Sequence, residues 1–279
     1  MKTYEEWLED VIKGYISLEN VPEEHKTSEL CWAAVKSNSY ALGDVPENLR
    51  TSELCLIAVN NCHEVFRECV PEHALTEEIC NLAVKKDGFN LEHVPEKFKT
   101  KELCWIAVKK NGWALEYVPE KFKTPELCLS AVKKYGRILE VVPENLMTVE
   151  MCEIAVGYRC CYMEFVPEKF KTEDMCWTAV KSHGLALELV PEKLKTQELC
   201  LKALESLNKT AREHVEDRER NEDARINDLG TLQELNTFLE YIPVKLRDAE
   251  MYLLFCELCY NVAYMRGYGR GYGMGYENG

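Results

Sequence analysis

A tripeptide, Val-Pro-Glu, recurs along this chain at a nearly constant interval, and this repetition constrains the fold more than any other feature. The step between copies is 24 residues, with one step of 25. The prolines are Pro22, Pro46, Pro71, Pro95, Pro119, Pro143, Pro167 and Pro191. A cysteine stands nine residues after each, at Cys31, Cys55, Cys80, Cys104, Cys128, Cys152, Cys176 and Cys200. Self-similarity with a period of about 20 to 50 residues is typical of solenoids and other repeat arrays.

Each unit is predicted to contain one α-helix, a short second helix and a tight turn. In one unit, Thr100 is the expected N-cap, because its hydroxyl can accept a hydrogen bond from an unpaired backbone N–H. The apolar stripe of the helix that follows is formed by Leu103, Cys104, Ala107 and Val108. We expect Trp113 to Tyr117 to form the second helix and Pro119 to Phe122 a single 3₁₀ turn.

A glycine follows the helix in four units, at Gly88, Gly112, Gly136 and Gly184. Glycine readily adopts the left-handed conformation that ends many helices. We therefore expect these four glycines to terminate their helices in that conformation.

Helices this short cannot bury an apolar face alone, but stacked units can cover one another. We predict an all-α, right-handed solenoid of about eleven 24-residue units, each with one α-helix and a short helix or 3₁₀ turn. Degenerate units are expected at the ends, with Trp7, Asp228 and Tyr252 in the cysteine position. The predicted regions are a regular solenoid over 1–205, degenerate repeats with a charged insertion and an apolar terminal helix over 206–265, and a disordered Gly/Tyr/Arg tail over 266–279.

The segment Ala107-Val108 through Glu120 carries the pattern A-V-x-x-x-G-x-A-L-E-x-V-P-E. It resembles an uncharacterised short helical tandem repeat found in bacterial and phage proteins, a domain of unknown function. The resemblance covers residues 1 to about 205 well and the remainder loosely. It implies a solenoid and supplies no catalytic residues.

Charge and composition exclude several classes of protein. The net charge is −14, which argues against a generic basic nucleic-acid binder. No run of about 18 apolar residues is present, so we expect no membrane span. The segment Met1 to Glu6 lacks the features of a signal peptide. With fourteen cysteines, this favours reduced thiols and a cytoplasmic location.

The repeat cysteines are expected to be packing residues. Equivalent residues of stacked helices lie about 8–10 Å apart, whereas a disulfide needs Cα atoms within about 7 Å. The metal-like cluster in the sequence is Cys62, His63, Cys69 and His73. Its spacing matches no common zinc pattern, so we predict no metal, and these four are the candidates if one is bound. We find no phosphate-binding loop or catalytic triad and predict neither a cofactor nor an enzymatic activity.

The favoured hypothesis is a non-catalytic scaffold that recognises a macromolecular partner, another protein, on a curved solenoid surface. The aromatic candidates for contacting it are Trp32, Trp105, Trp113, Tyr117 and Trp177. Two lysine rows join them: Lys97, Lys121, Lys169 and Lys193, and Lys99, Lys123, Lys171 and Lys195. The alternative interpretation places the aromatic residues in the core and the lysines in ion pairs with rows of glutamates.

Three other hypotheses stay open. Residues 1–75 carry 14 acidic and 6 basic side chains, which suits a partner with a basic surface and an acidic inhibitor or decoy of a nucleic-acid-handling protein, in a phage or defence context. Nucleic-acid binding through the lysine rows and the Arg-Gly-Tyr tail is less favoured. A homo-oligomer could form through the apolar C-terminal helix.

Overall fold

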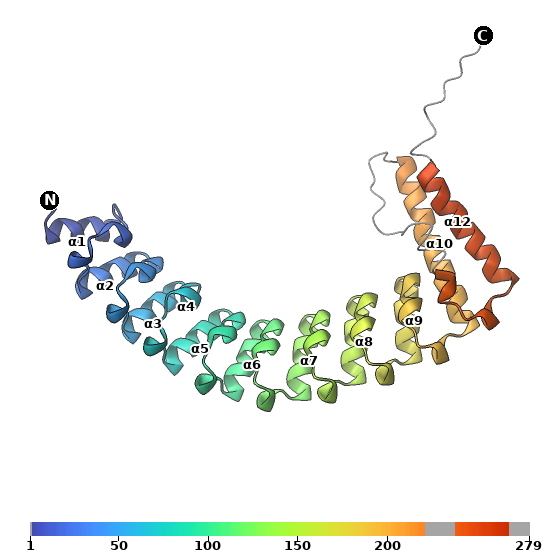
Figure 1. The fold of residues 1–279 in the computed structure, drawn as a ribbon, viewed down its shortest axis with the longest axis horizontal. Helices are drawn as coiled ribbons and strands as arrows, with labels where there is room; N and C mark the ends of the chain where they lie inside the picture. Colours follow the sequence, from blue (N-terminus) through green and yellow to red (C-terminus); the bar gives the residue numbers. More distant parts are fainter. Residues whose placement is uncertain (1, 221–237, 268–279) are drawn as a thin grey trace, which may run out of the picture. The chain divides into compact units, whose positions relative to one another are not determined.

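The computed structural model describes residues 2–220 and 238–267, and over these residues the chain is an all-α repeat solenoid without strands (Figure 1). It divides into two compact units, Met1–Val142 and Pro143–Gly279. The predicted fold class is confirmed in its repeated combination of an α-helix with 3₁₀ helices. The boundaries at 205 and 265 stay a prediction.

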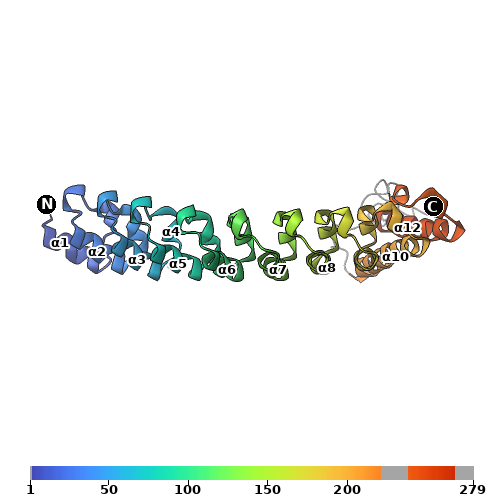
Figure 2. The ribbon, with the colours of Figure 1, turned by 90° about the horizontal axis from the view of Figure 1, so that it is seen from below.

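The first unit contains two rows of helices, which Figure 2 shows side by side. One row consists of α1 (Tyr4–Ile12), α2 (Ser28–Ser37), α3 (Ser52–Asn61), α5 (Glu77–Lys86), α6 (Lys101–Lys110) and α7 (Pro125–Lys134). The other consists of the 3₁₀ helices η3 (Ser39–Asp44), η6 (Gly88–His93), η8 (Gly112–Tyr117) and η10 (Gly136–Val141), with α4 (Val65–Glu68) between η3 and η6. Three-residue 3₁₀ turns such as η7 (Glu96–Phe98) and η9 (Glu120–Phe122) lead into the next α-helix.

The start of each helix is fixed by local sequence. The Thr100 hydroxyl accepts a hydrogen bond from the backbone N–H of Leu103 at 3.1 Å, as predicted for an N-cap. The same contact begins the helices that follow Thr27, Thr51, Thr76, Thr124, Thr148, Thr172 and Thr196. Pro125 occupies the first helical position of α7, where its missing N–H is not needed.

The helices end differently from the prediction. Within the described residues only Gly14 has a positive φ, so Gly88, Gly112, Gly136 and Gly184 are not left-handed caps. The residue before the glycine is extended instead, and in one unit the Asn111 side chain accepts the N–H of Trp113 at 3.1 Å.

Glycine is needed here for space. A Cβ on Gly88 would lie 2.2 Å from the carbonyl oxygen of Ala107, and one on Gly184 would lie 2.2 Å from that of Ala203. The backbones of neighbouring repeats therefore touch at these positions, closer than any side chain allows.

The core repeats with the sequence. Leu103, Cys104, Ala107 and Val108 are fully buried, and so are their counterparts in the neighbouring helices. Burial raises the pKa of the Cys104 thiol to about 11, because the charged thiolate would lose its solvation. All fourteen cysteines are free thiols. The repeat cysteines are packing residues, as predicted.

The second unit continues the pattern with α8 (Val149–Tyr158), η12 (Cys160–Phe165), α9 (Glu173–Ser182) and η14 (Gly184–Leu189). The next helix, α10 (Gln197–Arg220), is 24 residues long. Asn208 stands where the glycine would follow, and its buried side chain donates to the Leu254 carbonyl at 2.8 Å. Leu254 belongs to α12 (Ala249–Gly267), which packs along α10 after the turn η16 (Val244–Leu246).

The prediction for the last unit is corrected in one respect. Tyr252 does not take the buried cysteine position, because it is 48% exposed. The side chains of α12 that are buried instead are Met251, Phe255, Leu258 and Val262, a spacing that faces a single long helix. Asp228 and most of the predicted tail, from residue 268 onward, lie outside the described residues. The start of the charged insertion is part of α10.

Candidate interaction surface

The α-helices of the first unit share one outer flank, which is the side turned away from the buried stripe. The two residues that follow each repeat cysteine point to this flank, because they lie about 100° and about 200° around the helix axis from that buried cysteine. They are half-buried and mostly apolar: Leu56, Ile57, Leu82, Trp105, Ile106 and Leu129. We call this set the flank strip.

An open groove of about 770 Å³ lies on the flank between α3 and α5. Its apolar lining comes from Leu56, Ile57 and Leu82. The carboxylates of Glu77 and Glu78 line it from the first turn of α5. Lys85 and the amides of Asn60 and Asn81 complete the lining.

The flank strip therefore has charged borders of opposite sign. Acidic residues occupy the first turns of the helices, for example Glu102 in α6, next to Lys101, and Glu126 in α7. Lysines occupy the last turns of α5, α6 and α7. A ten-residue helix is about 15 Å long, so the two borders are separated by roughly that distance. This arrangement complements a protein surface with apolar side chains between two lines of charge.

Three of the predicted tryptophans lie on α-helices and share one arrangement. Trp105 is half-buried, and the ammonium group of Lys109 lies 5.5 Å from its ring centre. Trp32 is covered in the same way by Lys36 at 5.5 Å. In the second unit, Trp177 and Lys181 form the same pair at 5.2 Å. These tryptophans are neither core residues nor freely exposed, and one lysine covers each ring.

Trp113 and Tyr117 lie on η8, in the other row of helices. Tyr117 packs edge to face against Phe89 of η6, with 5.3 Å between ring centres. Burial, and then the nearby Glu92 and Glu116 carboxylates, raise the pKa of the Tyr117 hydroxyl. The predicted aromatic contacts are thus split between two rows of helices.

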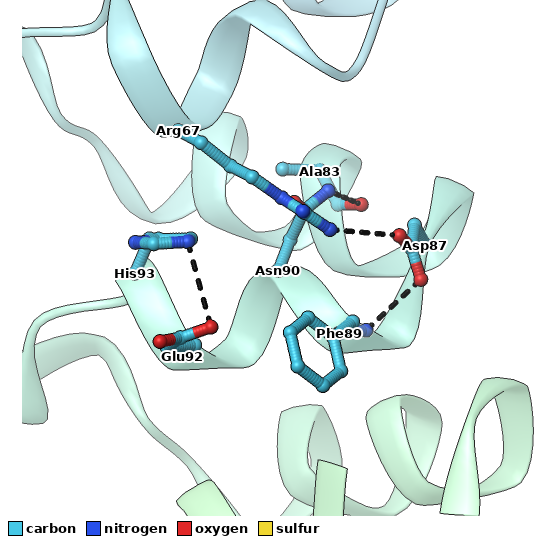
Figure 3. A network of polar contacts seen from close by, with 7 residues as sticks. All are labelled: Arg67, Ala83, Asp87, Phe89, Asn90, Glu92 and His93. Carbon is cyan, nitrogen blue, oxygen red and sulfur yellow. Dashed lines mark hydrogen bonds and ion pairs between the residues drawn. The ribbon is translucent and has the colours of Figure 1, made fainter. Parts of the chain in front are cut away.

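An arginine organises the row that contains Phe89 (Figure 3). Arg67 of α4 donates to the Asn90 side-chain oxygen at 3.1 Å and pairs with Asp87 at 3.1 Å. Its guanidinium carbon lies 5.4 Å from the Phe89 ring centre. Asn90 is fully buried and donates to the carbonyl of Ala83 at 3.0 Å. This network joins neighbouring repeats and has a structural role.

The two predicted lysine rows have different environments. The Lys99 side chain is 9% exposed, pairs with Glu96 at 3.0 Å and donates to the Tyr117 carbonyl of the following repeat at 3.1 Å. Lys171 likewise donates to the Leu189 carbonyl at 2.7 Å. Lys123 and Lys195 are 8% and 5% exposed and pair with glutamates. Lys99 and Lys171 thus connect neighbouring repeats, Lys123 and Lys195 pair within their own turns, and all four are too buried to contact a partner, contrary to the prediction.

The other row is exposed at the turns before the helices. Lys97, Lys121 and Lys169 each lie about 5 Å from the ring of the phenylalanine that follows them. Lys169 also pairs with Glu144 at 2.8 Å. Lys193 holds the equivalent exposed position in the second unit. This row precedes the acidic first turns, at the end of the helices opposite to Lys109.

The structure does not gather the metal candidates. Within the described ranges, no group of three or more His, Cys, Asp or Glu side chains is placed to hold a metal ion, so Cys62, His63, Cys69 and His73 do not converge. His63 instead has a buried Nδ1 without a hydrogen-bond partner among the described residues. Over the same residues, no helix combines the length and apolar character that crossing a membrane requires.

Sequence reasoning missed the flank strip and the lysines of the last helical turns. A signal for the lysines is present, because the tetrapeptide Ala-Val-Lys-Lys occurs at 83–86, 107–110 and 131–134. The half-buried apolar pair directly after each repeat cysteine was equally readable from the helical period.

Comparison with known proteins supports the repeat and leaves the activity open. Residues 51–99, 76–123 and 100–147 each match a family described as a domain of unknown function, DUF4116, so three overlapping copies cover residues 51–147. The resemblance to an uncharacterised tandem-repeat family is thereby confirmed over this segment. No curated protein and no solved structure matches the chain.

Proposed function

We propose that this protein is a non-catalytic scaffold that binds another protein through the outer flank of its α-helices. The observation that carries the proposal is the flank strip, a line of half-buried apolar side chains with an open groove and charged borders of opposite sign. Apolar and aromatic anchors beside polar rims are typical of protein-binding surfaces. The side-chain hydrogen bonds of Lys99, Lys171 and Arg67 between repeats come from the turns and from the other row of helices, away from the flank strip.

A photo-cross-linking amino acid tests the location of binding. It is placed at Leu82 on the flank and, as a matched control, at Arg137 in the other row of helices, and cross-linked partners are identified from native extracts. The proposal requires a partner that cross-links from Leu82 and not from Arg137. With that partner purified, Leu82→Asp and Ile106→Asp are expected to weaken binding at least tenfold while circular dichroism shows an unchanged helix content. Equal cross-linking from both positions, or unchanged affinity, would refute the proposal.

A second hypothesis is a homo-oligomer that forms through the C-terminal helix, α12. Leu253 and Tyr260 are 71% and 68% exposed, on the side opposite to the residues packed on α10. A helix that is apolar on both faces is usually covered on both. Sedimentation of the wild type and of Leu253→Glu tests this hypothesis. A dimer that forms through α12 would dissociate in the variant, whereas an unchanged sedimentation coefficient would contradict it.

The remaining hypotheses have less support from side-chain placement. Nucleic-acid binding loses one of its two lysine rows to internal contacts. The hypothesis of an acidic inhibitor or decoy rests on the excess of acidic side chains in residues 1–75. For the cytoplasmic location, the fourteen free thiols are consistent with a reducing compartment.

A further inference from the structure

The last turns of three adjacent helices form a continuous border of lysines. It comprises Lys85 and Lys86 of α5, Lys109 and Lys110 of α6, and Lys133 and Lys134 of α7, and we call it the lysine edge. Lysines stabilise the negative end of a helix dipole, but that role would apply equally to every helix. The same positions hold Asn60-Asn61 in α3 and Gly157-Tyr158 in α8. The pairs are therefore confined to one place in the array.

Five of the six lysines in the lysine edge have no carboxylate partner among the described residues. These five are Lys85, Lys86, Lys109, Lys110 and Lys134. Lys134 donates instead to the carbonyls of Lys109 and Lys110, at 2.7 and 2.6 Å. Residues 76–142 hold 12 basic and 10 acidic side chains, whereas the whole chain has a net charge of −14. The edge is thus a local positive region in an acidic protein.

We propose that the lysine edge binds an acidic segment of the protein partner, whose apolar side chains lie on the adjoining flank strip. This inference rests on the proposed function and adds the chemistry and orientation of the ligand. Acidic side chains of the segment contact the lysine edge, and its apolar side chains reach Leu82, Ile106 and Leu129. Any basic residues then lie toward the glutamates of the first helical turns.

Two observations favour an acidic protein segment over a nucleic acid. The ring of Trp105 is covered by its own Lys109, so it does not offer an open face on which a base can stack. The other border of the flank mixes Glu102 and Glu126 with Lys101, so it does not extend the positive region along which a phosphate backbone could spread.

Helix spacing gives the length of the segment. Neighbouring helices lie about 8–10 Å apart, so the edge spans roughly 20 Å from α5 to α7. An extended chain covers this distance in about six or seven residues at about 3.3 Å per residue.

Fluorescence anisotropy at about 50 mM salt tests the proposal with three labelled probes. The first is the peptide (Glu-Glu-Leu)₄, the second is (Glu-Glu-Ser)₄, and the third is the oligonucleotide (dT)₉, which carries the same eight negative charges. We expect the leucine peptide to bind at least tenfold tighter than the serine peptide, and the affinity of both peptides to fall as the salt concentration is raised. Tighter binding of (dT)₉ than of the leucine peptide would overturn the proposal in favour of a nucleic-acid site, and no binding of the leucine peptide would overturn it outright.

A matched pair of variants locates the binding. K109E/K110E is expected to lower the affinity for the leucine peptide at least tenfold. K97E/K121E makes the same change in net charge at the other end of the helices, and its affinity is expected to stay within about twofold of the wild type. Equal loss in both variants would show that only net charge matters and would refute the edge. If K109E/K110E left the affinity for the leucine peptide unchanged while Leu82 still cross-linked to the partner, this inference would be refuted and the proposed scaffold would stand.

Discussion

Replacing Gly88 with alanine tests the close contact between repeat backbones. The added Cβ would lie 2.2 Å from the carbonyl oxygen of Ala107 and 3.0 Å from the backbone nitrogen of Asn111. Both atoms belong to the backbone of the next repeat, so no side-chain rotation can relieve the overlap. Overpacking of a core typically destabilises by about 1–3 kcal/mol, and we expect Gly88→Ala to lie at about 3 kcal/mol.

Other glycines provide a graded series. At Gly112 the nearest atom to an added Cβ is Cδ2 of the Tyr135 ring, at 2.9 Å, which can move, and the Ala131 carbonyl oxygen lies at 3.1 Å, a looser backbone contact than at Gly88, so a loss of about 1 kcal/mol is expected. In the second unit, Gly184→Ala meets the Ala203 carbonyl at 2.2 Å and should resemble Gly88→Ala. Gly157 lies within α8 with nothing within 4 Å of its added Cβ, so alanine there is expected to stabilise by about 0.5–1 kcal/mol.

Urea unfolding followed by circular dichroism measures the series. With a slope of about 1–3 kcal/mol per molar urea, a 3 kcal/mol loss lowers the midpoint by about 1 M or more. The reasoning fails if Gly88→Ala unfolds within about 0.5 kcal/mol of the wild type, or if Gly157→Ala is the more destabilising change. Either result would mean that the repeats do not pack through these backbone contacts.

Three further predictions concern a buried lysine, a helix cap and a buried thiol. Lys99→Met should lower stability to urea by about 1–3 kcal/mol, because the Tyr117 carbonyl loses its buried donor, while the exposed Lys97→Met should stay within about 0.5 kcal/mol. Thr100→Ala should lower the thermal midpoint by an amount equivalent to about 1 kcal/mol, and Thr100→Ser should keep the wild-type midpoint, because serine retains the hydroxyl that accepts the Leu103 N–H. Burial raises the pKa of Cys104 from 9.0 to about 11, so between these values the folded state keeps the thiol proton that the unfolded state loses. The contribution of this thiol to the free energy of unfolding is therefore complete below pH 9 and is lost as the pH rises through 11. The urea midpoint should therefore fall across that range and fall less in Cys104→Ala, whereas a constant midpoint would contradict burial of the thiol.

The sequence was sufficient to predict what is decided within one repeat. Thr100 begins its helix because its own hydroxyl reaches a backbone N–H three residues away. Val118, which precedes a proline, ends the second helix in the extended conformation. The burial of Cys104 followed from its place in a helical stripe that recurs in register. Each of these features depends on near neighbours in the chain, so a single repeat contains the necessary information.

Features decided between repeats were not predictable in the same way. Gly88 looks like an ordinary helix terminator in sequence, and only the position of Ala107 in the next repeat reveals that it is a contact point. Lys97 and Lys99 are equally regular rows in the sequence. The structure separates them, because the Lys99 ammonium finds a carbonyl 18 residues later and that of Lys97 does not.

This separation explains why the flank is the candidate surface. The fully buried positions, such as the repeat cysteine and the alanine three residues after it, hold the same residue in nearly every unit, because each must fit the same neighbouring backbone. The residue after the repeat cysteine is not held in this way, and it changes from Leu56 to Asn81 to Trp105 along adjacent helices. The last helical turn changes as well, from an asparagine pair in α3 to lysine pairs in α5, α6 and α7. The invariant positions are the fully buried ones, so a partner that contacts the variable side chains of the flank would recognise one stretch of the array and not another.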